Sequence, residues 1–213
     1  MIFFPVGCLL FAAFLFLLPV LLLLGFFQVI TFGFESLGIP PGVTFFVLLA
    51  ILLGSSVNIP LTKKKKFYRE QKSLFDMFEQ PGLKEEGVAI NLGGAIIPIL
   101  ISIYFLTKVP LYPTIIATVI IIAISKYSAN VSERGVTLPF FIPPIASALL
   151  ALLLVPEYAA PAAFIAGVLG TLIGADLLNL KEARKMGMVY IGGAGVFDGI
   201  FLVGIMAVIL TSI

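Results

Sequence analysis

The chain has 213 residues, of which 61% are hydrophobic and 11% are charged. Soluble domains are about 45–50% apolar and about 25% charged, so this composition excludes an ordinary soluble protein and predicts an integral membrane protein. The formal net charge of +2 excludes a strongly basic surface for nucleic acid, and the lack of histidine excludes the common zinc sites and histidine-dependent triads. We therefore expect one transmembrane domain over residues 1–213, with no metal, no cofactor and no nucleic-acid partner.

Long apolar segments predict the membrane helices, since about 20 such residues cross the hydrocarbon core. In chain order they are Ile2–Ile30, Val43–Ile59, Gly87–Thr107, Leu111–Ser125, Leu138–Val155, Ala159–Leu180 and Val189–Ile213. The first segment lacks a basic start and is longer than a signal-peptide core, which favours a retained helix. The fourth and fifth are short, so full and re-entrant segments both stay open. The predicted fold class is all-α, a polytopic bundle of about seven helices.

The basic residues predict the orientation of this bundle, because lysine and arginine concentrate in cytoplasmic loops. In the seven-helix layout, 12 of the 13 basic residues fall on one side, and only Lys108 falls on the other. We therefore expect the N-terminus inside, the C-terminus outside, and a multi-pass protein of the plasma membrane.

A basic cytoplasmic interfacial loop is expected at residues 62–86, and we expect its lysines to contact anionic lipid headgroups. These lysines are Lys63, Lys64, Lys65 and Lys66. Phe67, Leu74, Phe75 and Phe78 follow at helical spacing, which predicts an amphipathic helix on the membrane surface. A docking surface for a partner or substrate is the alternative.

Two carboxylates, Asp176 and Asp198, lie within apolar segments, where a charge is costly and tends to serve function. If both segments are helical, the two aspartates lie about 6 Å and about 14 Å from the cytoplasmic helix ends. A short connection makes the two helices antiparallel neighbours. Asn91 and Asn179 are predicted at similar depth, so the four side chains are candidates for one site.

Glycines surround the aspartates, and we predict that they line the same site. Gly174 and Gly199 each follow another glycine by four residues, a spacing that permits close helix packing. Alternatively, the run from Gly192 to Gly195 is an unwound segment. Within a membrane, unwound backbone is tolerated only where it lines a cavity or is buried in protein. The predicted site-lining glycines are Gly174, Gly193, Gly195 and Gly199.

Two membrane aspartates support three kinds of function. As a catalytic dyad, one ionised carboxylate activates water while its protonated partner polarises a peptide carbonyl. As a transport site, carboxylate and asparagine oxygens bind a hard cation, or one aspartate relays protons. As structural groups, the aspartates pair with backbone N–H groups or with nearby basic side chains. The residues alone leave all three open.

Three stretches together resemble a prokaryotic membrane family catalogued as domain of unknown function 1614. They are NLGGAIIP at Asn91–Pro98, LIGADLLNL at Leu172–Leu180 and GGAGVFDGIF at Gly192–Phe201. The resemblance covers the chain from about Gly87 to the C-terminus. The family carries no activity that can be transferred to these residues.

A more distant likeness concerns intramembrane aspartyl proteases with a Gly-x-Gly-Asp motif and a second aspartate after an aromatic residue. Gly174-Ala175-Asp176 is similar to the first motif and Phe197-Asp198 to the second, although Ala175 replaces a glycine and the order is reversed. This likeness implies an intramembrane protease-like enzyme that cleaves transmembrane or membrane-proximal peptides, with Asp176 and Asp198 as its catalytic dyad. A small ion- or proton-coupled transporter and a non-catalytic membrane assembly protein are the alternatives.

Overall fold

The computed structural model describes residues 3–67, 83–132, 135–185, 187–193 and 199–212. This part of the chain is mostly helical, as predicted. Three helices are long and apolar enough to cross a membrane, namely Phe11–Ser36, Leu111–Ser128 and Pro156–Leu177. Helices of this kind are those of a membrane protein.

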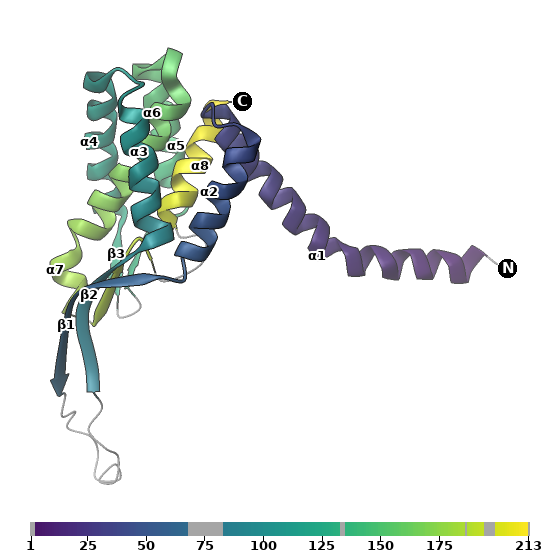
Figure 1. The fold of residues 1–213 in the computed structure, drawn as a ribbon, viewed down its shortest axis with the longest axis horizontal. Coiled ribbons are helices and arrows are strands. Elements are labelled where there is room, and N and C mark those ends of the chain that lie inside the picture. Colours follow the sequence, from purple (N-terminus) through teal and green to yellow (C-terminus); the bar gives the residue numbers. More distant parts are fainter. Residues whose placement is uncertain (1–2, 68–82, 133–134, 186, 194–198, 213) are drawn as a thin grey trace, which may run out of the picture.

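Most helices stand side by side in one bundle (Figure 1). The α-helices are α1 (Phe3–Ser36), α2 (Pro41–Gly54), α3 (Ile97–Leu106), α4 (Leu111–Ser128), α5 (Ile142–Leu154), α6 (Ala159–Thr171), α7 (Leu180–Ala183) and α8 (Gly199–Thr211). Two π-helical segments join them, η1 (Leu92–Ile96) before α3 and η3 (Leu172–Leu177) after α6, and a short 3-10 turn, η2 (Pro156–Tyr158), precedes α6. The long α1 leaves the bundle and projects to one side (Figure 1).

A three-stranded sheet lies at one end of the bundle (Figure 1). Its strands are β1 (Asn58–Phe67), β2 (Leu83–Asn91) and β5 (Met188–Ile191), in the order β1-β2-β5. β2 pairs antiparallel with β1 and parallel with β5. A separate hairpin consists of β3 (Asn130–Ser132) and β4 (Gly135–Thr137). The chain is therefore mostly helical, and these strands are the departure from the predicted all-α fold.

The sheet corrects the start of two predicted membrane helices. The segments expected to be helical from Gly87 and from Val189 begin as strands β2 and β5, and the described part of helix α8 runs from Gly199. A short apolar run fits a buried strand as well as a helix, so periodicity alone does not separate them. Pairing decides here, because Val88 and Val189 lie opposite each other in the parallel ladder and both are buried.

The basic segment at 62–86 is also partly strand. Phe67 ends β1, whereas Leu74, Phe75 and Phe78 lie outside the described residues, so the predicted amphipathic helix is not described. The flanks of the segment form a β-ladder in which Lys64 lies opposite Glu86 and Lys65 opposite Glu85.

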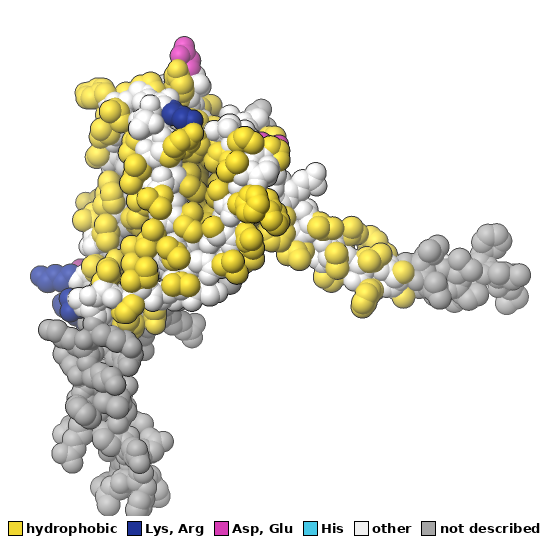
Figure 2. Space-filling model, in the orientation of Figure 1, with side chains coloured by type: hydrophobic (Ala, Val, Ile, Leu, Met, Phe, Trp, Pro, Cys, Tyr) yellow, Lys and Arg dark blue, Asp and Glu magenta, His cyan; other side chains and the backbone are white. Residues whose placement is uncertain are grey.

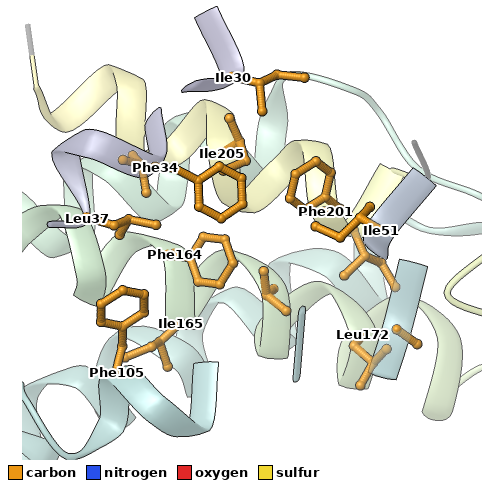
Figure 3. Close-up of a cluster of buried hydrophobic side chains, with 14 of the residues drawn as sticks. Ile30, Phe34, Leu37, Ile51, Phe105, Phe164, Ile165, Leu172, Phe201 and Ile205 are labelled. Atoms are coloured by element: carbon orange, nitrogen blue, oxygen red, sulfur yellow. The ribbon is translucent and has the colours of Figure 1, made fainter. Parts of the chain in front are cut away.

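The core of the bundle is a cluster of buried aromatic and aliphatic side chains (Figure 3). Phe34 of α1 stacks on Phe201 of α8 with ring centroids 6.0 Å apart, and Phe105 of α3 meets the edge of Phe164 of α6 at 6.3 Å. All four rings are at most 2% exposed. The core therefore joins α1, α3, α6 and α8, and each of these aromatic pairs adds about 0.5–1.5 kcal/mol beyond area burial.

Helix α6 lies at the centre and is buried on most of its surface, because small residues admit its neighbours closely. Ten of its 13 residues are buried. A Cβ added at Gly170 would lie 2.5 Å from Ile121 of α4, and one added at Gly204 of α8 would lie 2.5 Å from Val168. Such contacts fix the positions of the two helices that flank α6.

By contrast, most of α1 contacts little of the bundle. Its last turns pack on α8, where Ile30 and Phe34 are buried and Gly33 lies against Ile205. The earlier turns carry exposed apolar side chains such as Phe16 and Leu22. A helix that is apolar all round suits a lipid environment.

Replacing Gly170 by alanine tests the close packing of α4 on α6. The added methyl group would overlap Ile121, a stiff β-branched side chain in the core, so we expect a loss of about 1–3 kcal/mol in stability. Thermal unfolding in detergent, followed by circular dichroism, should give a lower Tm. Gly42→Ala is the matched control, because nothing lies within 4 Å of its added Cβ. An equal Tm for the two variants would contradict the packing argument.

Candidate functional site

The carboxylate of Asp176 is held at the sheet end of the bundle. Asp176 lies in η3, the π-helical continuation of α6, and its side chain is half-buried. Its Oδ2 accepts a hydrogen bond of 2.8 Å from the backbone N–H of Gly192, the residue that follows strand β5. A membrane aspartate is therefore fixed against the end of a strand by a backbone donor.

Gly192 and Gly193 form a turn that only glycine adopts readily. Their φ angles are +79° and +74°, in the left-handed region that other residues avoid. A Cβ added at Gly192 would lie 2.5 Å from the Cβ of Ala95 in η1. At Gly192 and Gly193, the backbone is therefore not helical, which agrees with the alternative that the glycine run is unwound. It also brings three stretches together, around Ala95, Asp176 and Gly192.

Each of the two π-helical segments has a glycine that another helix approaches with its backbone. A Cβ at Gly93 of η1 would lie 2.2 Å from the carbonyl oxygen of Ile51, and one at Gly174 of η3 would lie 2.4 Å from that of Ile122. π-helical turns are rare and frequently occur at functional sites. The predicted site residue Gly174 therefore lets α4 approach the turn that carries Asp176.

Asn91 is fully buried, and both ends of its amide make hydrogen bonds. Its Nδ2 donates to the carbonyl oxygen of Ser55 at 2.8 Å and to Oδ1 of Asn58 at 3.0 Å. Its Oδ1 accepts from the N–H of Gly94 at 2.7 Å and so caps η1. Asn91 thus ties the end of α2 and the start of β1 to the turn on which Gly192 packs.

Asn179 acts in a similar way at the other π-helical turn. It is 4% exposed, and its Nδ2 donates to the carbonyl oxygens of Ala175 at 2.8 Å and Gly174 at 3.3 Å. Its Oδ1 accepts a hydrogen bond from Lys126 at the end of α4, whose Nζ also donates to the carbonyl oxygen of Leu178 at 3.0 Å. The sequence places Lys126 only among the 12 basic residues expected on the cytoplasmic side, because one lysine in a last helical turn carries no spacing signal.

Two predicted site residues, Gly195 and Asp198, lie outside the described residues. The segment that contains them is bounded by Gly193, next to the hydrogen bond with Asp176, and by Gly199, where α8 begins. The predicted depth of Asp198 assumed a helix running from Val189, and this assumption is wrong because Met188–Ile191 form strand β5.

Most buried side chains in the described interior of the bundle are apolar, with several hydroxyl groups among them. Figure 3 shows the apolar cluster, to which Leu172, Phe164 and Phe201 belong. The buried hydroxyls of Ser102 and Ser147 each donate to the carbonyl oxygen four residues earlier in their own helix. The hydroxyls of Ser125 and Thr171 are also buried, and within the described residues they have no hydrogen-bond partner.

The described residues contain no group of three or more Asp, Glu, Cys or His side chains that could hold a metal ion. A cation shared by Asp176 and the two asparagines would also compete with existing bonds, because Asn91 Oδ1 accepts from Gly94 and Asn179 Oδ1 accepts from Lys126.

A family model described as "Protein of unknown function (DUF1614)" matches residues 52–210. The match includes all three stretches on which the resemblance to this family rested. No curated protein and no solved structure matches the chain.

Replacing Asn91 by alanine tests its role as a clamp. The substitution leaves the Ser55 carbonyl and the Gly94 N–H without their partner, and each unpaired buried group costs about 1–3 kcal/mol. We expect a Tm several degrees lower in detergent. Asn130→Ala, at an exposed position in β3, is the matched control and should leave the Tm unchanged. A wild-type Tm for Asn91→Ala would show that the clamp is dispensable.

Proposed function

This chain belongs to the DUF1614 family of proteins of unknown function, and we propose that it is an intramembrane aspartyl protease-like enzyme. Its substrates are transmembrane or membrane-proximal peptides, and its dyad is Asp176 and Asp198. The proposal rests on one observation: the carboxylate of Asp176 is bound to the backbone of Gly192, at the start of the glycine-rich segment that contains Asp198.

The position of Asp198 in the sequence supports the proposal that its carboxyl group lies near that of Asp176. Asp198 follows Gly192 by six residues and immediately precedes Gly199, the first residue of α8. Helix α8 packs on α6, the helix that leads into Asp176: Gly204 lies against Phe164 and Val168, and Gly167 lies against Val203. In the sequence, Asp176 therefore follows one helix of this packed pair and Asp198 directly precedes the described start of the other.

The chemistry needs only these two carboxyl groups and water. The ionised carboxylate takes a proton from water, whose oxygen attacks the peptide carbonyl carbon, while the protonated partner donates to the carbonyl oxygen. When the C–N bond of the tetrahedral intermediate breaks, the leaving nitrogen takes the proton that the first carboxylate removed from water, and a hydroxyl of the intermediate returns a proton to the second carboxylate. No metal or imidazole is required, which fits a chain without histidine.

Two observations favour a hydrolase over a transporter. The half-buried Asp176 lies at one end of the bundle, so water from one side suffices, and most side chains buried in the described interior are apolar. The oxygens of Asn91 and Asn179 already accept hydrogen bonds, which reduces their capacity to bind a cation. A non-catalytic assembly protein is the remaining alternative, and it requires neither aspartate for activity.

The proposed arrangement in the membrane has about seven crossings, with the N-terminus inside and the plasma membrane as the site of residence. Three long and four shorter apolar helices in the described chain support this number. Lys126, Lys181 and Lys185 belong to the sheet end, and Lys108 lies in the opposite connection between α3 and α4. Figure 2 shows basic side chains gathered at the sheet end. The lysines from Lys63 to Lys66, in β1, are proposed to contact anionic lipid.

Labelling of single cysteines tests this orientation. In a Cys8→Ala background, which removes the single native cysteine, Lys108→Cys should react with a membrane-impermeant maleimide in intact cells. Lys185→Cys should react only after permeabilisation, because its loop faces the cytoplasm. The reverse pattern would contradict the proposed orientation.

A cleavage assay tests the proposed activity. Purified protein in liposomes is incubated with a pool of transmembrane peptides, and products are identified by mass spectrometry. Asp176→Asn and Asp198→Asn should each lower the cleavage rate about 10²–10⁴-fold, since each removes one proton-transfer group. Glu157→Gln, an exposed carboxyl group far from the sheet end, is the matched control.

Cleavage that persists in both aspartate variants would refute the dyad. If wild type cleaves nothing, the same vesicles serve for ion and proton flux, and flux that depends on Asp176 would replace the protease by a transporter. Aspartate variants that alter only the Tm would instead support the assembly protein.

A further inference from the structure

The peptide group before Asp176 is held by the amide of Asn179. Ala175 directly precedes Asp176, and its carbonyl oxygen accepts the 2.8 Å hydrogen bond from Asn179 Nδ2. The carbonyl of Gly174 accepts from the same nitrogen at 3.3 Å. A π-helical turn has an irregular ladder of backbone bonds, so such side-chain donors help to fix its shape.

The amide of Asn179 can donate hydrogen bonds to these two carbonyls in only one of its two orientations. An asparagine side chain has an acceptor oxygen on one branch and an NH₂ donor on the other. If the amide of Asn179 flipped, its oxygen would face the carbonyls of Gly174 and Ala175, and its NH₂ would face the ammonium of Lys126. Both contacts would be repulsive. The ammonium of Lys126 therefore sets the orientation, through a charge-assisted hydrogen bond.

Lys126 is itself held in place relative to η3. It lies in the last turn of α4, and its Nζ also binds the carbonyl oxygen of Leu178. One turn earlier, the carbonyl of Ile122 lies where a Cβ of Gly174 would be, so α4 and η3 are in backbone contact. The ammonium, the amide and the turn form one connected unit.

We propose that Lys126 is a positioning residue for Asp176, acting through Asn179. Its ammonium lies two hydrogen bonds away from the carbonyl of Ala175, the residue before Asp176, and need not contact the reacting atoms. Its effect on catalysis rests on the proposed function, whereas its effect on the shape of η3 does not. The orientation of the carboxylate toward Gly192 then depends on a charge carried by a different helix.

The experiment compares Lys126→Met, which removes the ammonium and keeps most of the stem, with Lys126→Arg, which keeps the charge. Lys185→Met is the matched control, because this exposed lysine also lies at the sheet end. Hydrogen exchange read by mass spectrometry over residues 172–178 should be at least tenfold faster in Lys126→Met. It should be near wild type in Lys126→Arg and in Lys185→Met. In the cleavage assay, Lys126→Met should lower kcat at least tenfold and change KM less than twofold.

Unchanged exchange over residues 172–178 in Lys126→Met would overturn the proposal, and so would faster exchange with wild-type kcat. If the wild type has no protease activity, the proposed function fails and the exchange result alone decides. If exchange is then faster in Lys126→Met and near wild type in Lys126→Arg, the result supports a positioning role for Lys126 at whatever site Asp176 forms. A faster rate in Lys185→Met as well would show a general effect of lost charge and would also overturn the proposal.

Discussion

The structure depends on hydrogen bonds to backbone N–H and carbonyl groups that water does not reach. Both π-helical turns depart from the regular helical ladder, and in lipid or in a protein core an unpaired carbonyl or N–H is costly. Two asparagine amides meet this requirement. Asn91 accepts from an N–H of η1 and donates to a carbonyl at the end of α2, and Asn179 donates to two carbonyls within η3. With these turns held, the strand end at Gly192 has a fixed surface against which to pack.

The glycines serve the same arrangement from the steric side. Gly93 and Gly174 admit the backbone of a neighbouring helix to each turn, and Gly192 adopts a left-handed conformation against Ala95. Amide and glycine thus act together at each turn: one satisfies its polar groups and the other makes room for its neighbour. This explains why the three motifs occur far apart in the chain and yet meet at one place.

Much of this was predictable from the sequence, but not all of it. Composition and apolar runs predicted a helical membrane protein, and isolated polar residues in apolar runs pointed to Asp176, Asn91 and Asn179. The strands were missed, because the short apolar runs around Val88 and Val189 fit a helix equally well until their pairing is known. Lys126 was missed for a similar reason, since its contact with Asn179 joins residues from different helices. The position of Asp198 relative to Asp176 stays a prediction.

The parallel pairing of β2 with β5 has a consequence for biogenesis. Gly87 lies opposite Met188, so about a hundred residues are synthesised between the two partners, and ribosomes add roughly 5–20 residues per second. The first two strands can form a local hairpin early, whereas the third arrives only with the last membrane segments. Non-local parallel pairing is also slow to form. The carboxylate of Asp176 therefore reaches its backbone partner late in insertion, and a nascent chain halted before β5 would have no assembled site.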